Sequence, residues 1–154
     1  MSAYTATVLW QRGDDDFAGN RYSRGHEWQF DGGLTVPASA SPDIVPLPHS
    51  VAENVDPEEA FVASLSSCHM LFFLAYAREE GIVVEEYRDE ATGYLERGAD
   101  GKHAMTRVVL RPHAKYAPGT EPGSDRLEAL HHRAHEACFI ANSVKSEITA
   151  EIVA

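Results

Sequence analysis

A long segment near the middle of the chain, residues 56–77, repeats its apolar side chains at helical spacing. Its apolar face contains Phe61, Leu65, Phe72 and Tyr76. Further apolar residues widen this face until little polar surface remains, which is typical of a helix inside a core or a subunit interface. Asp56 suits the N-cap, Glu59 stands three residues later as in a capping box, and Gly81 follows as a stop. The pattern predicts one long helix around which the other elements are arranged.

Alternating polar and apolar residues predict strands on both sides of this helix. The predicted strands are residues 4–11, 21–30, 34–36, 82–96, 104–113 and 146–153. A second helix is expected to have Ser124 or Asp125 as its cap, and its apolar stripe ends at Cys138. A proline-bearing loop, residues 37–54, is of the length that often covers a functional site. This order of elements predicts an α+β fold with a largely antiparallel sheet, in a single domain of residues 1–154.

The second predicted strand, residues 21–30, has two faces of different character. One face, by parity, contains Tyr22, Arg24, His26, Trp28 and Phe30. This face is expected to point inward, which would bury Arg24. A buried guanidinium is costly unless an acceptor meets it, so Arg24 should have a partner in the chain. Arg21 falls on the polar face and is expected to be solvated.

Charge and length exclude several classes of protein. The 154 residues carry a formal net charge of -11, and this acidity argues against nucleic acid and anionic membranes as partners. The longest strictly apolar run, residues 70–77, is too short to span a bilayer, and no basic, apolar leader precedes the first strand. We therefore expect a soluble, cytoplasmic protein whose two cysteines remain thiols.

Each predicted helix carries one cysteine, and the residues around both cysteines resemble a known family. Asp56-Pro57-Glu58-Glu59 leads through Ala63-Ser64-Leu65-Ser66-Ser67 to Cys68, and Ala137-Cys138-Phe139-Ile140-Ala141-Asn142-Ser143 precedes the last strand. These motifs and the order of elements resemble the OsmC/Ohr family over essentially the whole chain. Two positions depart from the family pattern. Peroxidase members commonly have a proline where Phe139 stands, and a histidine such as His69 after the first cysteine is unlike the best-known branches.

The resemblance implies a peroxidase of organic hydroperoxides that works through cysteine and has no cofactor. It implies that Cys68 attacks the peroxide, that Cys138 resolves the oxidised sulfur, and that Glu58 holds an active-site arginine. Arg24 is the candidate for this arginine because of its predicted strand face. The resemblance also implies an intertwined homodimer with its sites at the dimer interface, reduced by a dithiol of the lipoyl type.

The thiol chemistry also follows from the residues themselves. A free cysteine near pH 7 is mostly protonated, so a peroxidase needs a cation beside the attacking sulfur, and Arg24 can serve as that cation. Attack on the O–O bond leaves a sulfenic acid, which condenses with a second thiol to a disulfide that an external dithiol reduces. An apolar pocket would favour fatty or aromatic hydroperoxides over hydrogen peroxide. The residues expected to line this pocket are Phe61, Leu65, Phe72, Trp28, His26 and His69.

The distance between Glu58 and Cys68 bears on where the site lies. The two residues are ten positions apart, which is roughly 15 Å along a straight helix. They cannot touch within one helix. If the helix crosses its two-fold copy antiparallel near Ala63 and Ser64, Glu58 of one subunit comes level with Cys68 of the other. This geometry predicts a site at a dimer interface.

A metal site is the main alternative for the second helix. His131, His135 and Cys138 fall on one helix face at spacings acceptable for zinc or iron. A thiol committed to a metal would not be free to resolve a sulfenic acid.

A non-catalytic dimer that binds a small ligand is a further alternative. In that case Cys68 is a core residue and Arg24 binds a carboxylate of the ligand. His26 and His69 are either hydrogen-bonded core histidines or groups that polarise a pocket.

Overall fold

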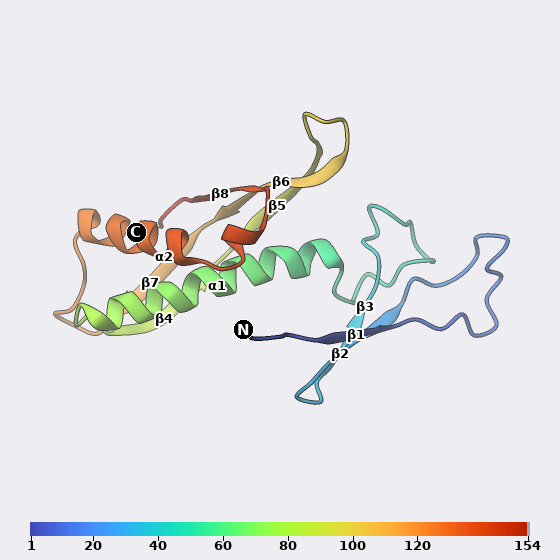
Figure 1. The fold of residues 1–154 in the computed structure, drawn as a ribbon, viewed down its shortest axis with the longest axis horizontal. Coiled ribbons are helices and arrows are strands. Elements are labelled where there is room, and N and C mark those ends of the chain that lie inside the picture. The colour runs from blue at the N-terminus through green and yellow to red at the C-terminus, as the bar shows by residue number, and fades with distance from the viewer. Residues whose placement is uncertain (154) are drawn as a thin grey trace. The chain divides into compact units, whose positions relative to one another are not determined.

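The alternating residues near the N-terminus form a three-stranded antiparallel sheet in the computed structural model, which describes residues 1–153. Its strands, in spatial order, are β1 (Ala6–Leu9), β2 (His26–Phe30) and β3 (Thr35–Ala38) (Figure 1). Trp28 lies in the middle of this sheet, opposite Val8 on one side and Val36 on the other. The sheet belongs to the first of two compact units, Met1–Ala60; the second unit is Phe61–Ala154.

Strand β2 is shorter than the sequence pattern predicts. Residues 21–25 lie outside it, so strand parity does not orient Arg24, and this part of the prediction is wrong. The ladder stops because β3 ends at Ala38, opposite His26, where β1 has already left the sheet. Arg24 instead donates its backbone N–H to the carbonyl of His49, in the long loop after β3.

The central helix is α1 (Pro57–Glu79), and its first turn is capped as the sequence predicts. The backbone N–H of Glu59 donates to Asp56 Oδ1 at 2.8 Å, and the N–H of Asp56 donates to Glu59 Oε2 at 3.2 Å. These reciprocal bonds satisfy two donors that the helix itself leaves free. Beyond the other end, Gly81 has a positive φ of 75°, a conformation that favours glycine and stops the helix.

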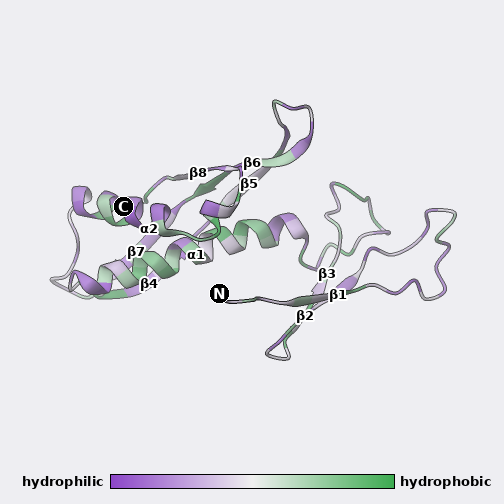
Figure 2. Ribbon diagram, viewed as in Figure 1, coloured by the Kyte–Doolittle hydropathy of each residue, from purple (hydrophilic) through white to green (hydrophobic). Residues whose placement is uncertain are grey.

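Helix α1 buries one stripe of side chains rather than its whole apolar surface. The buried residues are Leu65, His69, Phe73 and Ala77, about one per turn. Apolar residues also occupy much of the remaining surface (Figure 2), and Leu71 is 60% exposed in the single chain. By length and composition alone α1 could cross a membrane, although its strictly apolar run is short. The core helix of a soluble protein meets the same criteria, so this is weak evidence.

In the second unit, each of the two long strands predicted after α1 is broken into two. The four strands are β4 (Val84–Asp89), β5 (Thr92–Arg97), β6 (His103–Leu110) and β7 (Pro112–Tyr116). Strand β4 pairs with β7, while β5, β6 and β8 (Glu147–Ala150) form a separate sheet in which β6 and β8 are parallel. Asp89 stabilises the break because its carboxylate accepts hydrogen bonds from the Arg111 N–H and the Ser66 hydroxyl.

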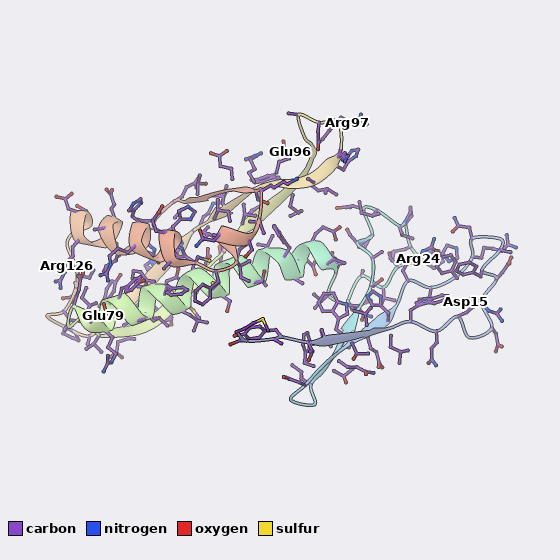
Figure 3. All side chains as sticks on the ribbon, in the orientation of Figure 1. Asp15, Arg24, Glu79, Glu96, Arg97 and Arg126 are labelled. Atoms are coloured by element: carbon purple, nitrogen blue, oxygen red, sulfur yellow. The ribbon has the colours of Figure 1, made fainter. Side chains whose placement is uncertain are left out.

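The second long helix is α2 (Ser124–Ala137), followed by a short 3-10 turn at Ala141–Ser143. Its N-cap is Gly123, without a side-chain capping bond, so the predicted cap at Ser124 or Asp125 is wrong. Ion pairs of Arg126 with Glu80, and of Arg133 with Glu79, connect α2 to the C-terminal end of α1. Arg126 and Glu79 are labelled in Figure 3.

Two apolar clusters form the core of the second unit. The first contains Phe73, Ala77, Ile82, Leu130 and Ala134 and joins the C-terminal half of α1 to α2. The second contains Leu65, Val108 and Leu110 and joins α1 to β6. The fold is therefore α+β with mainly antiparallel sheets, as predicted, and α1 is shared by both clusters.

Candidate active site

The two cysteines, 70 residues apart in the sequence, come together in the second unit. Cys68 lies in the middle of α1 and is partly exposed, whereas Cys138 caps the C-terminus of α2 and is 1% exposed. The two side chains are close enough for Cys68 to raise the pKa of Cys138, and both are free thiols. The packing of α2 on α1 therefore brings two reduced sulfur atoms within reach of one another.

The surroundings of Cys138 favour its protonated form. Burial raises the pKa of this thiol, and the neighbouring Cys68 raises it further. The backbone N–H of Ala141, which donates to Cys138 Sγ at 3.4 Å, acts in the opposite direction but is weaker than the effect of burial. Because the thiolate is the nucleophile, Cys138 is poorly suited to attack a substrate, and the more accessible Cys68 is better suited.

An aromatic pair lies beside the two thiols. Phe72 is one turn after Cys68 on α1, and Phe139 directly follows Cys138. Their ring centroids are 5.0 Å apart and their planes are nearly perpendicular, at 87°, which is a favourable edge-to-face arrangement. Phe139, which departs from the proline common in the resembled peroxidases, thus adds an apolar side chain close to Cys138.

His69, the residue after Cys68, is a buried, hydrogen-bonded histidine. Its Nε2 lies 3.0 Å from Nδ1 of His131 on α2, and the two ring planes are parallel to within 5°. Burial lowers the pKa of each imidazole to about 4, so both are neutral at pH 7. His69 therefore connects α1 to α2, which is the core role considered from the sequence.

The metal site considered from the sequence is not formed. His131 is hydrogen-bonded to His69, and Cys138 lies close to the Cys68 thiol. Within residues 1–153, no three His, Cys, Asp or Glu side chains are arranged to hold a metal ion. The helical spacing of His131, His135 and Cys138 does not translate into a ligand set, and His131 is already bonded to His69.

Arg24 lies in the first unit, on the segment before β2 (Figure 3). Its guanidinium donates to the Tyr22 carbonyl at 2.6 Å and to Asn20 Oδ1 at 2.8 Å. It also lies 3.6 Å from the centre of the Tyr22 ring, in cation–π geometry. The acceptors that the Arg24 guanidinium was expected to have are therefore present, but they are neutral groups rather than a carboxylate. Among the described residues of the single chain, the ion pairs do not include one between Arg24 and Glu58.

His26 is held in one tautomer by two hydrogen bonds. Its Nδ1–H donates to the Arg24 carbonyl at 2.7 Å, and its Nε2 accepts from the indole N–H of Trp28 at 3.2 Å. Because both ring nitrogens are occupied, His26 is a structural histidine that fixes the backbone of Arg24. It is not placed to transfer protons.

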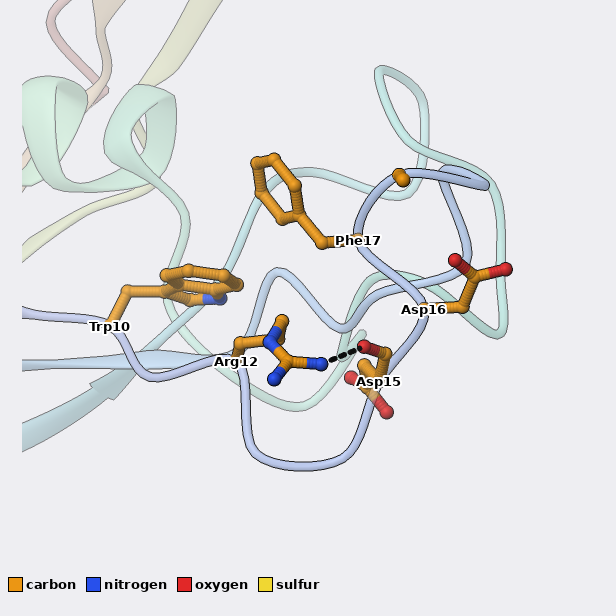
Figure 4. Close-up of a pocket in the computed structure, with 6 residues that line it drawn as sticks. Trp10, Arg12, Asp15, Asp16 and Phe17 are labelled. Atoms are coloured by element: carbon orange, nitrogen blue, oxygen red, sulfur yellow. Dashed lines mark hydrogen bonds between the residues drawn. The ribbon is translucent and has the colours of Figure 1, made fainter.

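An apolar cavity of about 530 Å³ lies next to Arg24 in the first unit. Three aromatic rings line it and contact one another, those of Trp10, Phe17 and Tyr22, with centroids 4.7 to 5.8 Å apart. A neighbouring hollow of about 540 Å³ shares Trp10 and Phe17 and adds polar residues such as Arg12 (Figure 4). Tyr22 was expected on the same face as Arg24, but no pattern indicates Phe17, because it stands in an acidic, glycine-bearing loop without periodicity.

The other residues predicted for the site lie in different parts of the fold and do not form one pocket lining. Leu65 is 1% exposed and packs in the core with Val108, so its assignment to the pocket lining is wrong. Phe61 is half-buried against the same cluster. Trp28 is half-buried in β2, and Glu58 is half-buried in the first turn of α1.

Comparisons with known proteins are consistent with this fold. A family model described as OsmC-like protein matches residues 50–153. The chain is 52% identical to an OsmC-like protein of unknown function from Vibrio cholerae, with a TM-score of 0.97 over 99% of this chain and 100% of that chain. No curated protein sequence matches the chain significantly.

Two more distant structures share the fold. An organic hydroperoxide resistance protein from Legionella pneumophila is 19% identical, with a TM-score of 0.68 over 99% of this chain and 97% of that chain. A second such protein, from Bacillus subtilis, is 20% identical, with a TM-score of 0.66 over 97% of this chain and 98% of that chain. Since the family model covers most of the chain, and the Vibrio cholerae protein matches it along its whole length, the chain belongs to the OsmC-like protein family.

Proposed function

We propose that the protein reduces organic hydroperoxides to alcohols through Cys68 and Cys138. The observation that carries this proposal is the neighbouring pair of free thiols, one partly exposed and the other buried. A partly exposed cysteine can meet a substrate, and a protonated partner next to it can form a disulfide afterwards. Two relatives with the same fold are organic hydroperoxide resistance proteins, which supports this class of substrate.

The reaction is balanced by two thiols and one external reductant. The Cys68 thiolate attacks the outer oxygen of the hydroperoxide, so an S–O bond forms, the O–O bond breaks, and the alkoxide leaves and takes up a proton. Cys138 then attacks the oxidised sulfur, an S–S bond forms, and water leaves. A dithiol, of lipoyl type in our proposal, returns two electrons and two protons by thiol–disulfide exchange.

Arg24 is proposed as the cation that stabilises the Cys68 thiolate and the departing alkoxide. A guanidinium remains charged at all relevant pH values and can hydrogen-bond an anion with two N–H groups. Arg24 already lines an apolar cavity, where charge interactions are stronger than in water. Glu58 is proposed to orient it in the assembled protein.

The preference for organic over inorganic peroxide is attributed to the apolar surroundings of these groups. Trp10, Phe17 and Tyr22 beside Arg24, and the Phe72–Phe139 pair beside the thiols, offer apolar contacts to an alkyl or aryl group. Hydrogen peroxide has no such group and would gain nothing from them.

A homodimer in the cytoplasm is part of the same proposal. The apolar surface that α1 leaves exposed in the single chain needs a partner, and a second copy of the chain would cover it. A reducing compartment would keep both cysteines as thiols between turnovers.

The proposal is tested by peroxide consumption with the intact protein. Cumene hydroperoxide and hydrogen peroxide are compared at equal concentration, with dihydrolipoamide or a thioredoxin system as the reductant. We expect sustained turnover of cumene hydroperoxide with at least one reductant and much slower turnover of hydrogen peroxide. Absence of turnover in every combination, with both thiols verified as reduced, would instead support a non-catalytic ligand-binding protein.

A further inference from the structure

His131 on α2 is held by two side chains of α1 that are four positions apart, about one turn. His69 meets its edge, with Nε2 and Nδ1 3.0 Å apart, ring centroids 5.3 Å apart and planes parallel to within 5°. Phe73 meets its face, with centroids 4.3 Å apart and 16° between the planes. His69 and His131 are 2% and 5% exposed. One ring of α2 is therefore fixed on α1 by an edge contact and a face contact.

The hydrogen bond of this pair adds direction to the packing of the two helices. Burying two imidazoles costs free energy that two apolar side chains of similar volume would not cost. Burial lowers the pKa of each imidazole to about 4, so both are neutral at pH 7, and one ring donates its N–H to the other. A hydrogen bond weakens steeply when its partners shift or tilt, whereas apolar side chains can slide past one another. The pair therefore fixes the register of α2 on α1.

The same two helices carry the two thiols, close to the histidines. Cys68 directly precedes His69 on α1. Cys138, at the C-cap of α2, follows His131 by seven positions, about two helical turns, and so falls on the same side of the helix. Cys68 is close enough to Cys138 to raise its pKa. A movement of α2 along α1 that broke the histidine bond would therefore also move Cys138 relative to Cys68.

Disulfide formation is sensitive to such a movement. An S–S bond of about 2 Å forms only when the two Cα atoms are within about 7 Å and the side chains point toward each other. The ion pairs of Arg126 with Glu80, and of Arg133 with Glu79, also join α2 to α1, but they are exposed and formed by long, flexible side chains. They restrain the position of Cys138 less strictly than a buried, directional bond does.

We propose that His69 and His131 are positioning residues for the disulfide step, because their hydrogen bond holds Cys138 where it can attack the oxidised Cys68. The imidazoles act through the placement of α2 and not by transferring a proton. This inference rests on the proposed roles of Cys68 and Cys138 and concerns the second step only. The first step, attack of Cys68 on the hydroperoxide, does not use Cys138 and should not depend on the pair.

Two substitutions of His131 separate the hydrogen bond from packing. His131→Phe keeps a ring against Phe73 and removes both nitrogens. His131→Asn removes the ring but keeps a hydrogen-bonding atom one bond beyond Cγ, where Nδ1 stands. Disulfide formation should be slower in His131→Phe by about tenfold or more, as expected for thiols displaced by a fraction of 1 Å, and His131→Asn should recover much of the loss. Leu130→Val, at the neighbouring buried position, controls for lost packing and should leave the rate unchanged.

Single-turnover reactions measure the two steps separately. Reduced protein is mixed with one equivalent of cumene hydroperoxide without a reductant. Release of cumyl alcohol reports the first step, and loss of alkylatable thiols and trapping of sulfenic acid by dimedone report the second. In His131→Phe we expect alcohol release at the wild-type rate and accumulation of the Cys68 sulfenic acid.

The same variants are then oxidised with diamide, which requires no peroxidase activity. The Cys68 thiolate adds to the N=N bond, Cys138 attacks that sulfur, the S–S bond forms, and the hydrazine leaves with both thiol protons. The expected order of disulfide formation is again wild type, His131→Asn, His131→Phe. Failure to consume hydroperoxide, together with this order under diamide, would count against the proposed function and support the positioning role.

Folding of each variant is checked by circular dichroism. If His131→Phe does not fold, His69→Leu replaces it and His69→Gln, whose amide lies near the position of Nε2, replaces His131→Asn. The proposal is overturned if the hydrogen-bonding variant forms the disulfide no faster than the apolar variant. It is also overturned if both match the wild-type protein, or if Leu130→Val slows the disulfide step as much as His131→Phe does.

Discussion

At the scale of single residues, the two thiols differ in accessibility and in protonation. Cys68 is partly exposed on α1, while burial keeps Cys138 protonated at the end of α2. The attacking sulfur needs access and the resolving sulfur does not. Replacing Cys68 and replacing Cys138 should therefore impair peroxide consumption in different ways.

Replacing the thiols one at a time tests this division. Cys68→Ser should consume no peroxide, because the attacking sulfur is gone. Cys138→Ser should consume one equivalent per site and then stop, with Cys68 held as a sulfenic or more oxidised acid. Rapid-mixing peroxide assays and mass spectrometry of the products measure both outcomes. Exchange of the two phenotypes would reverse the assignment.

Arg24 gives a second prediction at this scale. Arg24→Ala should slow the reaction of Cys68 with cumene hydroperoxide on the order of a hundredfold, the effect of losing one electrostatic stabiliser at a dry site. Arg24→Lys should recover only part of the rate, because lysine lacks the fork of N–H groups. Stopped-flow single turnover measures these rates.

Arg21 provides the matched control. It is exposed and pairs with Asp16 rather than lining the cavity beside Arg24. Arg21→Ala should leave the rate within a factor of about two, as expected for an exposed ion pair. A large effect of Arg21→Ala together with none of Arg24→Ala would mean that the wrong arginine was chosen.

At the scale of elements, α1 was the most predictable part of the chain because several local signals agree there. The cap at Asp56, the box with Glu59 and the stop at Gly81 were all confirmed. The breaks between β4 and β5, and between β6 and β7, were missed, since they depend on Asp89 accepting from Arg111 and Ser66, which are distant in the sequence. Strand alternation alone does not contain that information.

For the candidate site, the sequence indicated the two thiols but not the side chains that surround them or the partners of Arg24. The helical positions of Cys68 and Cys138 indicated two thiols on apolar faces, and the structure brings them together. The partners of Arg24 could not be predicted, because residues 21–25 leave the strand and parity no longer applies. The hydrogen bond between His69 and His131 joins residues 62 positions apart on two helices, so no local pattern shows it.

The cap of α1 leads to a stability prediction. Asp56→Ala removes the acceptor for the Glu59 N–H and should lower the free energy of unfolding by about 1 kcal/mol. Glu53→Ala, an exposed acidic residue in the preceding loop, is the control and should change it by less than about 0.5 kcal/mol. Urea unfolding followed by circular dichroism measures both. Equal effects would show that the capping bonds do not stabilise the helix.

The histidine pair between α1 and α2 predicts how stability depends on pH. The pKa of His69 and of His131 is lowered from 6.5 to about 4 by burial; His135 adds to this lowering for His69, and Asp89 opposes it. The unfolded chain therefore binds more protons than the folded chain between these pH values. Stability from the neutral pair is fully present above pH 6.5 and is lost as the pH falls toward 4, by at most about 3 kcal/mol per imidazole.

Urea unfolding at several pH values between 7.5 and 4.5 tests this pair. The wild-type protein should lose stability steadily below pH 6.5, and His131→Phe should show a shallower loss. His132→Asn, at an exposed position on the same helix, should retain the wild-type slope. A slope that is the same in all three proteins would assign the pH dependence to other groups.

At the scale of the whole molecule, the exposed side of α1 is an apolar surface that the single chain leaves uncovered. Leu71 is 60% exposed in the middle of this side, and small residues such as Ser64, Ser67 and Ala75 surround it at helical spacing. We expect two copies of α1 to pack there. Leu71→Glu should weaken dimerisation by about tenfold or more, because it would bury an unpaired charge.

Leu95→Glu is the control for the dimer, since Leu95 is an exposed leucine on β5 outside this surface. Sedimentation velocity over a range of concentrations measures the association of the wild-type protein and of both variants. A monomeric wild-type protein, or equal effects of the two substitutions, would contradict dimerisation through α1.

The central claim is that Cys68 and Cys138 together reduce one molecule of organic hydroperoxide, and a single stoichiometric reaction tests it most directly. Reduced protein is mixed with one equivalent of cumene hydroperoxide without a reductant, and intact mass, alkylatable thiols and cumyl alcohol are measured. We predict one equivalent of alcohol, loss of both thiols, and a mass lower by two hydrogen atoms, from a Cys68–Cys138 disulfide. Unreacted hydroperoxide with both thiols still open to alkylation would contradict the account.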